Sequence, residues 1–173
     1  MIVADATPLI VLAKLDRLAL LKQGYGEVLV APAVYDEVVD QELAKGALEV
    51  AFIQRAVEEG WMQRVQLTGG EQRLAERLVA HGRLDRGEAE SLAMARTRGL
   101  RLVLDDKEGR VAAGAFSVHY LGTVGVILKA YGKGRLEHGE VVGVLGDLAR
   151  VLWTVPDVIT EALARARRIR IRT

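Results

Sequence analysis

The chain has 173 residues and a net charge of +1, and half of its residues are hydrophobic. These properties predict one globular domain with a sizeable core and exclude a disordered chain. Cysteine is absent, which excludes disulfides, thiolate zinc sites and cysteine nucleophiles. No apolar run approaches the roughly 20 residues needed to cross a bilayer, and no signal peptide is apparent, so we expect a soluble cytoplasmic protein.

Short apolar runs alternate with longer amphipathic segments along the chain. The predicted strands are residues 2–4, 28–30, 61–67, 100–104 and 118–121. The predicted helices are residues 8–15, 16–22, 32–40, 42–58, 71–80, 85–98, 106–115, 123–130, 139–152 and 157–168. Thr7 is the predicted N-cap of the first helix, Pro8 its first residue, and Gly69-Gly70 a turn. The alternation predicts an α/β fold with a mainly parallel central sheet of four to five strands.

Two of the predicted strands end in acidic residues. Asp5 follows the first strand, and the adjacent pair Asp105-Asp106 follows the fourth. Because parallel sheets bind ligands outside the carboxyl ends of their strands, these acids should meet at one edge of the sheet. Crowded carboxylates ionise together only at a cost, which a divalent cation would offset.

Further acids could join them from two helices. Glu37 follows the second strand, and Glu88 and Glu90 lie near the start of the helix predicted over residues 85–98. Clusters of carboxylates suit Mg²⁺ or Mn²⁺, whereas the three histidines show no ligand spacing. A cation held in this way can activate a water molecule and neutralise a phosphodiester, which is nuclease chemistry without a protein nucleophile.

Each acid also has a structural alternative. Asp5 and the Asp105-Asp106 pair could be helix N-caps, and Glu37 could be an exposed helical residue. Glu88 and Glu90 could simply favour the positive end of a helix. The joint occurrence of these acids, and no single one of them, favours a site.

Four segments of the chain resemble, in order and spacing, the acidic motifs of the PIN-domain family. They are Asp5–Ile10 (DATPLI), Val34–Val38 (VYDEV), Gly87–Glu90 (GEAE) and Leu104–Asp106 (LDD). A later segment, Leu121–Val126 (LGTVGV), resembles one PIN subfamily whose members are mostly described as predicted nucleic-acid-binding proteins. That subfamily is related to the VapC-type toxins of bacterial toxin–antitoxin pairs.

The resemblance implies a three-layer α/β/α fold and a Mg²⁺- or Mn²⁺-dependent nuclease that acts on single-stranded RNA. Position by position, it assigns the catalytic, metal-binding acids to Asp5, Glu37, Glu88 and Asp106. Asp105 is a candidate further ligand, and the Thr7 hydroxyl lies beside the first acid. Many PIN domains carry Asp at the position of Glu88, so this longer side chain could reach the metal directly or through water. Glu90 should point off the helix face that Glu88 occupies.

The general PIN pattern covers residues 1–131, and residues 132–173 are expected to form a C-terminal helical extension packed on the same domain. Basic side chains beside the acids are candidates for contacts with RNA phosphates: Arg86, Lys107 and Arg110. Lys107 could instead pair with a neighbouring acid. The basic run 165–172 could bind nucleic acid, be a solvated terminus, or add an edge strand to a partner.

The very apolar helix that runs from Val141 to Trp153 could complete the core or bury an interface. PIN domains commonly dimerise, so a homodimer is expected; a groove for an antitoxin peptide is the alternative, and no membrane partner is expected. The leading functional hypothesis is a metal-dependent endoribonuclease, which could be a toxin. Its rivals are a non-catalytic nucleic-acid- or protein-binding module, and a phosphatase with Asp5 as nucleophile. The phosphatase is disfavoured because Thr7 stands where a second Asp would be needed.

Overall fold

One parallel sheet organises the fold. The computed structural model describes residues 1–41, 48–152 and 156–169. Its five strands are β1 (Ile2–Ala4), β2 (Val28–Val30), β3 (Met62–Arg64), β4 (Leu102–Val103) and β5 (Tyr120–Leu121). They lie in the order β3-β2-β1-β4-β5, and every neighbouring pair is parallel. The predicted α/β class with a mainly parallel sheet is therefore confirmed.

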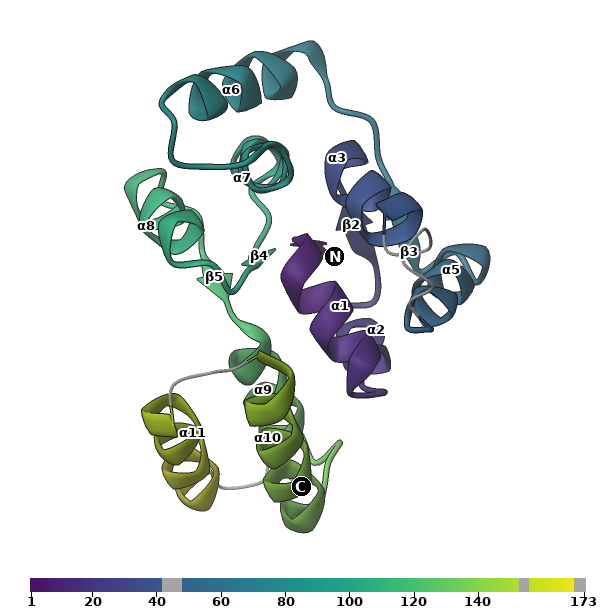
Figure 1. The fold of residues 1–173 in the computed structure, drawn as a ribbon, viewed down its shortest axis with the longest axis vertical. Helices are drawn as coiled ribbons and strands as arrows, with labels where there is room; N and C mark the ends of the chain where they lie inside the picture. The colour runs from purple at the N-terminus through teal and green to yellow at the C-terminus, as the bar shows by residue number, and fades with distance from the viewer. Residues whose placement is uncertain (42–47, 153–155, 170–173) are drawn as a thin grey trace.

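Helices cover both faces of this sheet. They are α1 (Ala6–Lys14), α2 (Ala19–Tyr25), α3 (Pro32–Tyr35), the π-helical η1 (Asp36–Gln41), α5 (Val50–Glu58), α6 (Gly69–Ala80), α7 (Arg86–Arg98), α8 (Lys107–Ala115), α9 (Thr123–Gly132), α10 (His138–Leu152) and α11 (Pro156–Arg168). Helices α2 and α5 contact β2 and β3, whereas α7 contacts β1 and β4 and carries α8 beside it (Figure 1). The result is the three-layer α/β/α arrangement.

The strand order creates a crevice at the carboxyl ends of β1 and β4. From β1 the chain moves outward through β2 to β3, and it then returns to β4 on the other side of β1. Neighbouring strands whose crossovers leave in opposite directions open a gap at their carboxyl ends, where ligands of such folds bind. Asp5 directly follows β1, and Asp105 stands two residues after the end of β4.

Local sequence signals explain where α7 begins and ends. Asp85 caps its start: the Asp85 carboxylate accepts from the Glu88 backbone N–H at 2.8 Å, and the Glu88 carboxylate accepts from the Asp85 N–H at 3.0 Å. Gly99 ends the helix in the left-handed conformation, at φ 64°. This reciprocal cap fixes both acids at the mouth of the crevice.

Three sequence predictions differ from the structure. Helix α1 begins at Ala6, so Asp5 and not Thr7 is its N-cap residue, and Pro8 is tolerated in the first turn. Gly69-Gly70 opens α6 and is not a turn, because a capping box between Thr68 and Glu71 starts that helix earlier. The helix predicted over residues 42–58 begins, within the described residues, at Val50; residues 42–47 lie outside them.

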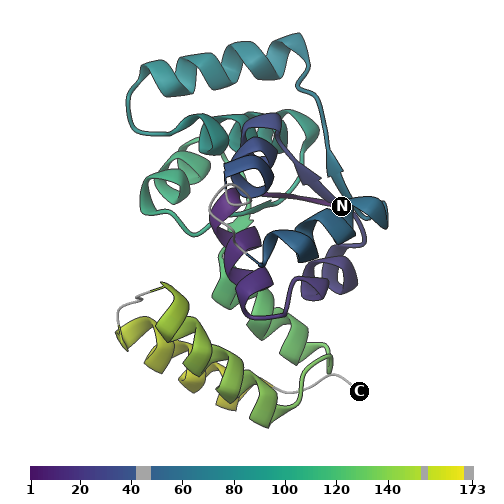
Figure 2. The ribbon, with the colours of Figure 1, turned by 45° about the vertical axis from the view of Figure 1, so that its right-hand side comes forward.

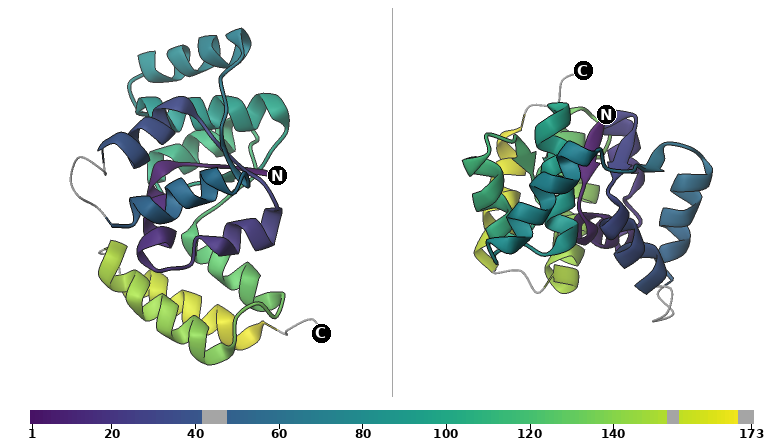
Figure 3. Two further views of the ribbon diagram at one scale, coloured as in Figure 1. Left: turned by 90° about the vertical axis from the view of Figure 1, so that its right-hand side faces the viewer. Right: turned by 90° about the horizontal axis from the view of Figure 1, so that it is seen from above.

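The C-terminal helices pack as a group on the end of the molecule opposite α6 (Figures 2 and 3). Helices α10 and α11 contact each other and α9, and α10 also contacts α1. Val141, Leu145 and Leu148 are fully buried within this one chain, so the apolar α10 completes the core. Trp153 and residues 170–172 of the basic run lie outside the described residues. No helix in the described part is long and apolar enough to span a bilayer.

A buried ion pair fastens α6 to α7. The Glu71 side chain is only 1% exposed, and its carboxylate accepts from Arg98 Nε at 2.7 Å and Nη2 at 2.9 Å. The same carboxylate accepts the Thr68 backbone N–H at 2.7 Å. These bonds satisfy a charge that would otherwise be costly to bury.

Removing the cation of this pair should therefore destabilise the fold. We expect Arg98→Ala to lower the free energy of unfolding by about 3–5 kcal/mol, because Glu71 would stay buried without its partner. Arg55→Ala is the matched control, since Arg55 pairs with Glu59 on an exposed surface, where a pair is worth about 0–1 kcal/mol. Urea denaturation measures both, and equal losses would contradict this account.

Candidate active site

The acids at this end of the sheet, Asp5, Glu37, Asp85, Glu88 and Asp106, are called the acid group. Asp5 is its nearly buried member. Its side chain is 5% exposed, and the Ser91 hydroxyl donates to Asp5 Oδ1 at 3.5 Å. Burial, the largest cause, and the nearby charges of Glu88, Asp85 and Glu37 together raise the pKa of Asp5 to about 7, against the opposing effect of the Ala6 N–H. Asp5 occupies the N-cap position of α1 but makes no capping hydrogen bond with its side chain. The Asp5 carboxylate therefore does not serve as a side-chain cap of α1.

Glu88 and Asp106 lie close together across the gap between α7 and α8. Their side chains are hydrogen-bonded, which raises the pKa of Glu88 and lowers that of Asp106. Burial is the main cause that brings the Glu88 pKa to about 7, with the Asp85 and Asp106 charges adding to it. Asp106 is held ionised chiefly by the Gly109 N–H, and its Oδ1 also accepts from the Glu108 N–H at 2.7 Å. Glu88 is therefore the donor and Asp106 the acceptor.

Glu37 and Asp85 approach the same group from either side of Gly87. A methyl group placed on Gly87 would lie 3.6 Å from Glu37 Oε2 and 3.4 Å from Asp85 Oδ1. Glu37 reaches this position from the π-helical segment η1, a rare backbone form that occurs often at functional sites. The absence of a side chain at Gly87 thus leaves space between two acids from distant parts of the chain.

The acids approach one another in pairs. Within residues 1–41, 48–152 and 156–169, no three His, Cys, Asp or Glu side chains are grouped closely enough to enclose a metal ion. The donors are nonetheless all carboxylate oxygens, and two of them have a pKa raised to about 7 by burial and mutual repulsion. A hard divalent cation is the ligand that this chemistry fits, because it replaces protons with a compensating charge.

Comparison with known proteins identifies the family. A family model described as a PIN domain matches residues 1–168. This chain is a PIN domain. Searches of curated proteins and of solved structures found no match. PIN domains are generally nucleases, and those nucleases generally use divalent metals.

Asp105 has a different environment from its neighbour Asp106 in this PIN domain. Asp105 Oδ1 accepts the Thr123 backbone N–H at 2.9 Å, and Oδ2 accepts the Thr123 hydroxyl at 2.5 Å. Arg110 Nη2 also donates to Oδ1, at 3.2 Å. A Cβ on Gly122 would lie 2.6 Å from that same oxygen, so only glycine leaves room for this contact. Both Asp105 oxygens therefore hold the start of α9.

Glu90 also has a structural role. Its buried carboxylate accepts the Ala33 N–H at 2.9 Å and Arg86 Nε at 2.8 Å. This contact joins α7 to the first turn of α3, which leads directly into η1 and Glu37. Glu90 thus holds the start of the helical segment that carries Glu37. Its side chain points toward α3, away from Asp106, as expected for a residue on a different helix face from Glu88.

The basic and hydroxyl residues that are expected to contact the substrate fall into two sets: two arginines that form ion pairs, and Thr7 and Lys107, which form none within the described part of the chain. Thr7 and Lys107 are exposed next to Asp5 and Asp106, and Lys107 forms no ion pair with any described residue. Arg110 and Arg86 bind Asp105 and Glu90, and both keep much of their side chains exposed. Lys107 is therefore the cation beside the acids that a phosphate could reach without breaking an ion pair.

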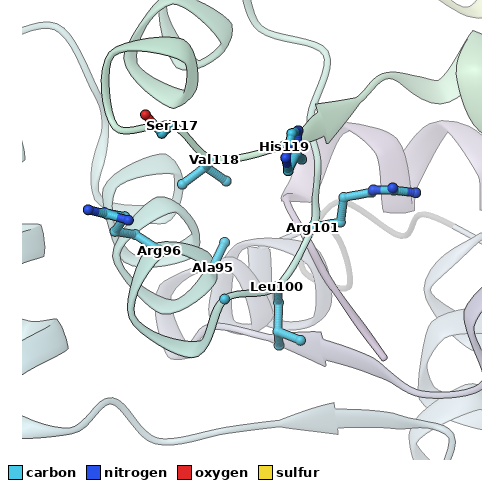
Figure 4. A pocket seen from close by; sticks show the side chains of 8 residues that line it. Ala95, Arg96, Leu100, Arg101, Ser117, Val118 and His119 are labelled. Carbon is cyan, nitrogen blue, oxygen red and sulfur yellow. The ribbon is translucent and has the colours of Figure 1, made fainter.

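A separate hollow lies at the other edge of the sheet. It has a volume of about 290 Å³ and is lined by the end of α7 and by the segments that precede β4 and β5. Figure 4 shows Arg96 and Arg101 on opposite sides of it, with Val118 between them. Because Asp5 and Asp106 follow the carboxyl ends of the strands, this hollow does not belong to the acid group.

Sequence reasoning assigned no site role to Asp85 or Ser91. Asp85 was expected only as a helix N-cap, yet its charge raises the pKa of both Asp5 and Glu88. The available signal was spacing: Asp85, Glu88 and Ser91 stand three residues apart, which places them along one side of the start of α7.

The raised pKa of Asp5 predicts a specific pH dependence of stability. An acid with a folded-state pKa of about 7 and an ordinary value of 3.8 stabilises the fold below pH 4, and that stability is lost as the pH rises through 7. We expect Asp5→Asn to raise the free energy of unfolding by up to about 4 kcal/mol at pH 8, at about 1.4 kcal/mol per pKa unit.

The gain from Asp5→Asn should shrink below about 1 kcal/mol at pH 4, where the wild-type carboxyl is already protonated. Chemical denaturation at both pH values measures the difference between variant and wild type. Asp147→Asn, on exposed α10, serves as the control and should show no such pH-dependent gain. An Asp5→Asn gain that is equal at pH 4 and pH 8 would contradict the buried, ionisable Asp5 described above.

Proposed function

We propose that this PIN domain is a Mg²⁺- or Mn²⁺-dependent endoribonuclease that hydrolyses single-stranded RNA. The observation that carries the proposal is that Glu88 lies near both Asp5 and Asp106 at the crevice between β1 and β4, and that the pKa of Asp5 and of Glu88 is raised to about 7. The family membership of the chain supports the reaction class, and the resemblance to VapC-like proteins supports RNA as substrate.

The proposed ligands are Asp5, Glu88 and Asp106, with Glu37, whose charge acts on Asp5, as a further one. A bound divalent cation would supply an activated water molecule and neutralise phosphate charge. Before a cation binds, Asp5 and Glu88, whose pKa values are about 7, are partly protonated at neutral pH. Cation binding should therefore displace protons and become tighter as the pH rises through 7.

Substrate would approach from the solvent side of α8. Lys107 projects beside Asp106 and is the proposed phosphate contact, while Thr7 lies on the exposed first turn of α1. Because the related VapC-type proteins are toxins, the proposal includes a toxin role, a small antitoxin protein as partner, and a homodimer as the assembly.

We propose that Asp105 positions α9 and is not a metal ligand. Replacing it by Ala removes the cap on Thr123 and should lower the free energy of unfolding by about 1–2 kcal/mol. The increase in melting temperature produced by Mn²⁺ should remain as large as in wild type. Asp106→Ala is the matched control and should lose that increase. Loss of the Mn²⁺ effect in Asp105→Ala alone would instead make Asp105 a ligand.

The cleavage reaction is tested with a single-stranded RNA that carries a fluorophore and a quencher. With Mg²⁺ or Mn²⁺ we expect cleavage that falls at least about 100-fold in Asp5→Asn, Glu88→Gln and Asp106→Asn, since each removes charge needed at the metal. Asp147→Asn should cleave at the wild-type rate. EDTA should stop cleavage.

The same samples separate this proposal from its alternative, a non-catalytic binding module. Fluorescence anisotropy in EDTA measures RNA binding without cleavage, and differential scanning fluorimetry measures Mn²⁺ binding without RNA. RNA binding with no cleavage under any metal condition would favour the non-catalytic module. Cleavage that is unchanged in all three acid variants would place the reaction elsewhere or in a contaminant, and would overturn the proposal.

A further inference from the structure

A second concave surface lies between α6 and α8, on the outer side of the helical layer that contains α7. This groove has a volume of about 510 Å³, within the range of binding clefts. Its walls come from α6, α8 and the loop that joins α6 to α7. In Figure 1, α6 lies over α7 at the end of the molecule, with α8 beside them. None of the proposed metal ligands lines this groove.

The walls are apolar and arranged in two helical rows. Leu74 and Leu78 stand one turn apart on α6, and Ala112 of α8 stands one turn before Phe116, the residue that follows α8. These four side chains are half-buried, although each packs against the core. Leu84, from the connecting loop, adds a buried apolar side chain. Two facing rows with this spacing match the side chains that a helix presents at positions i and i+3 or i+4.

The rim of the groove carries basic side chains. The polar lining residues are Arg77, His81 and Arg83, and all three are exposed. One acid reaches this rim: Glu108 Oε2 lies 3.6 Å from Arg83 Nη1. Both side chains are exposed to solvent, where such an ion pair is weak. The opposite side of α6 is different, because Glu76 and the paired Arg86 and Glu90 line it. The groove side therefore carries an excess of basic side chains, whereas the opposite side carries both signs of charge.

We propose that this groove binds an amphipathic helix of a partner protein, with apolar side chains one turn apart and Asp or Glu beside them. Apolar walls match the helix anchors, and the basic rim matches its acids. RNA fits less well, because the apolar walls offer a nucleobase few groups for hydrogen bonding to its edges. The inference does not depend on nuclease activity.

The groove ends next to the acid group without sharing residues with it. Leu84 directly precedes Asp85, and Arg83 contacts Glu108, two residues beyond Asp106. A helix seated in the groove would thus contact the loop before α7, and Arg83 of that loop pairs with Glu108 in the first turn of α8. These are the two segments that hold Glu88 and Asp106.

The partner chemistry is tested by selecting peptides from a random 16-residue display library on the full-length protein. Counter-selection on the double variant Leu78→Ser, Arg77→Glu removes peptides that bind elsewhere. We expect the enriched peptides to combine apolar residues at i and i+3 or i+4 with neighbouring Asp or Glu. The best peptide is then synthesised with a fluorophore, together with a form in which its acids are replaced by Lys.

Anisotropy titrations should show that Leu78→Ser and Arg77→Glu each weaken binding of the acidic peptide at least about tenfold. Two controls lie outside the groove: Val79→Ser, on the opposite side of α6, matches the first variant, and Arg55→Glu, on the exposed surface of α5, matches the second. Both should bind like wild type. The Lys form should bind at least about tenfold more weakly. Thermal melts test whether each variant is folded. If Leu78→Ser is unfolded, the result is decided by Arg77→Glu, because Arg77 is exposed.

Several results would overturn the proposal. They are no enriched peptides, enriched peptides that are basic or uncharged, and equal affinity for the groove variants and their controls. A fourth is an RNA effect: if Leu78→Ser and Arg77→Glu weaken binding of a single-stranded RNA but not of the peptide, the groove belongs to the nucleic acid. Self-association that the same variants abolish would assign the groove to a second copy of this chain and would also overturn it.

Discussion

The parallel pairing of β1 with β4 is the constraint on which the acid group depends. Val3 pairs with Leu102 and Ala4 with Val103, and the Asp5 N–H donates to the Val103 carbonyl at 3.0 Å. This pairing joins the first and second halves of the chain at the middle of the sheet. It also buries Asp5 between strands that have helices on both faces, and this burial is the largest cause of its raised pKa. Without β4 beside β1, Asp5 and Asp106, each of which lies near Glu88, would not be held at the same end of the sheet.

The acids differ because their local donors differ. Asp106 accepts two backbone N–H groups at the start of α8, and its pKa is lowered. Asp5 stands at a similar position before α1 but makes no capping bond there, and its pKa is raised. Glu88 lies between these cases, since it accepts the Asp85 N–H and is hydrogen-bonded to Asp106. Asp106 therefore ionises at a lower pH than Asp5 and Glu88 do.

The sequence was sufficient to predict the strands, most helices and the edge of the sheet where the acids meet. Apolar runs that end in Asp marked β1 and β4, and the Asp85, Glu88 and Gly99 signals marked α7. Sequence alone could not separate the roles of Asp105 and Asp106. That separation depends on Thr123, which binds Asp105 from α9, and on Gly122, which leaves space for the contact. Such long-range contacts leave no periodic pattern in the chain.

The central place of β1 also affects when the acid group can form during synthesis. Strand β1 leaves the ribosome before the other strands. Strand β4 and Asp106 are made only after β2, β3 and α7. At typical translation rates of about 5–20 residues per second, roughly 5–20 s separate Asp5 from Asp106. Throughout that interval one edge of β1 has no strand beside it, and the acids from the two halves of the chain are apart. A nascent chain therefore cannot assemble the proposed centre before β4 and Asp106 have been translated.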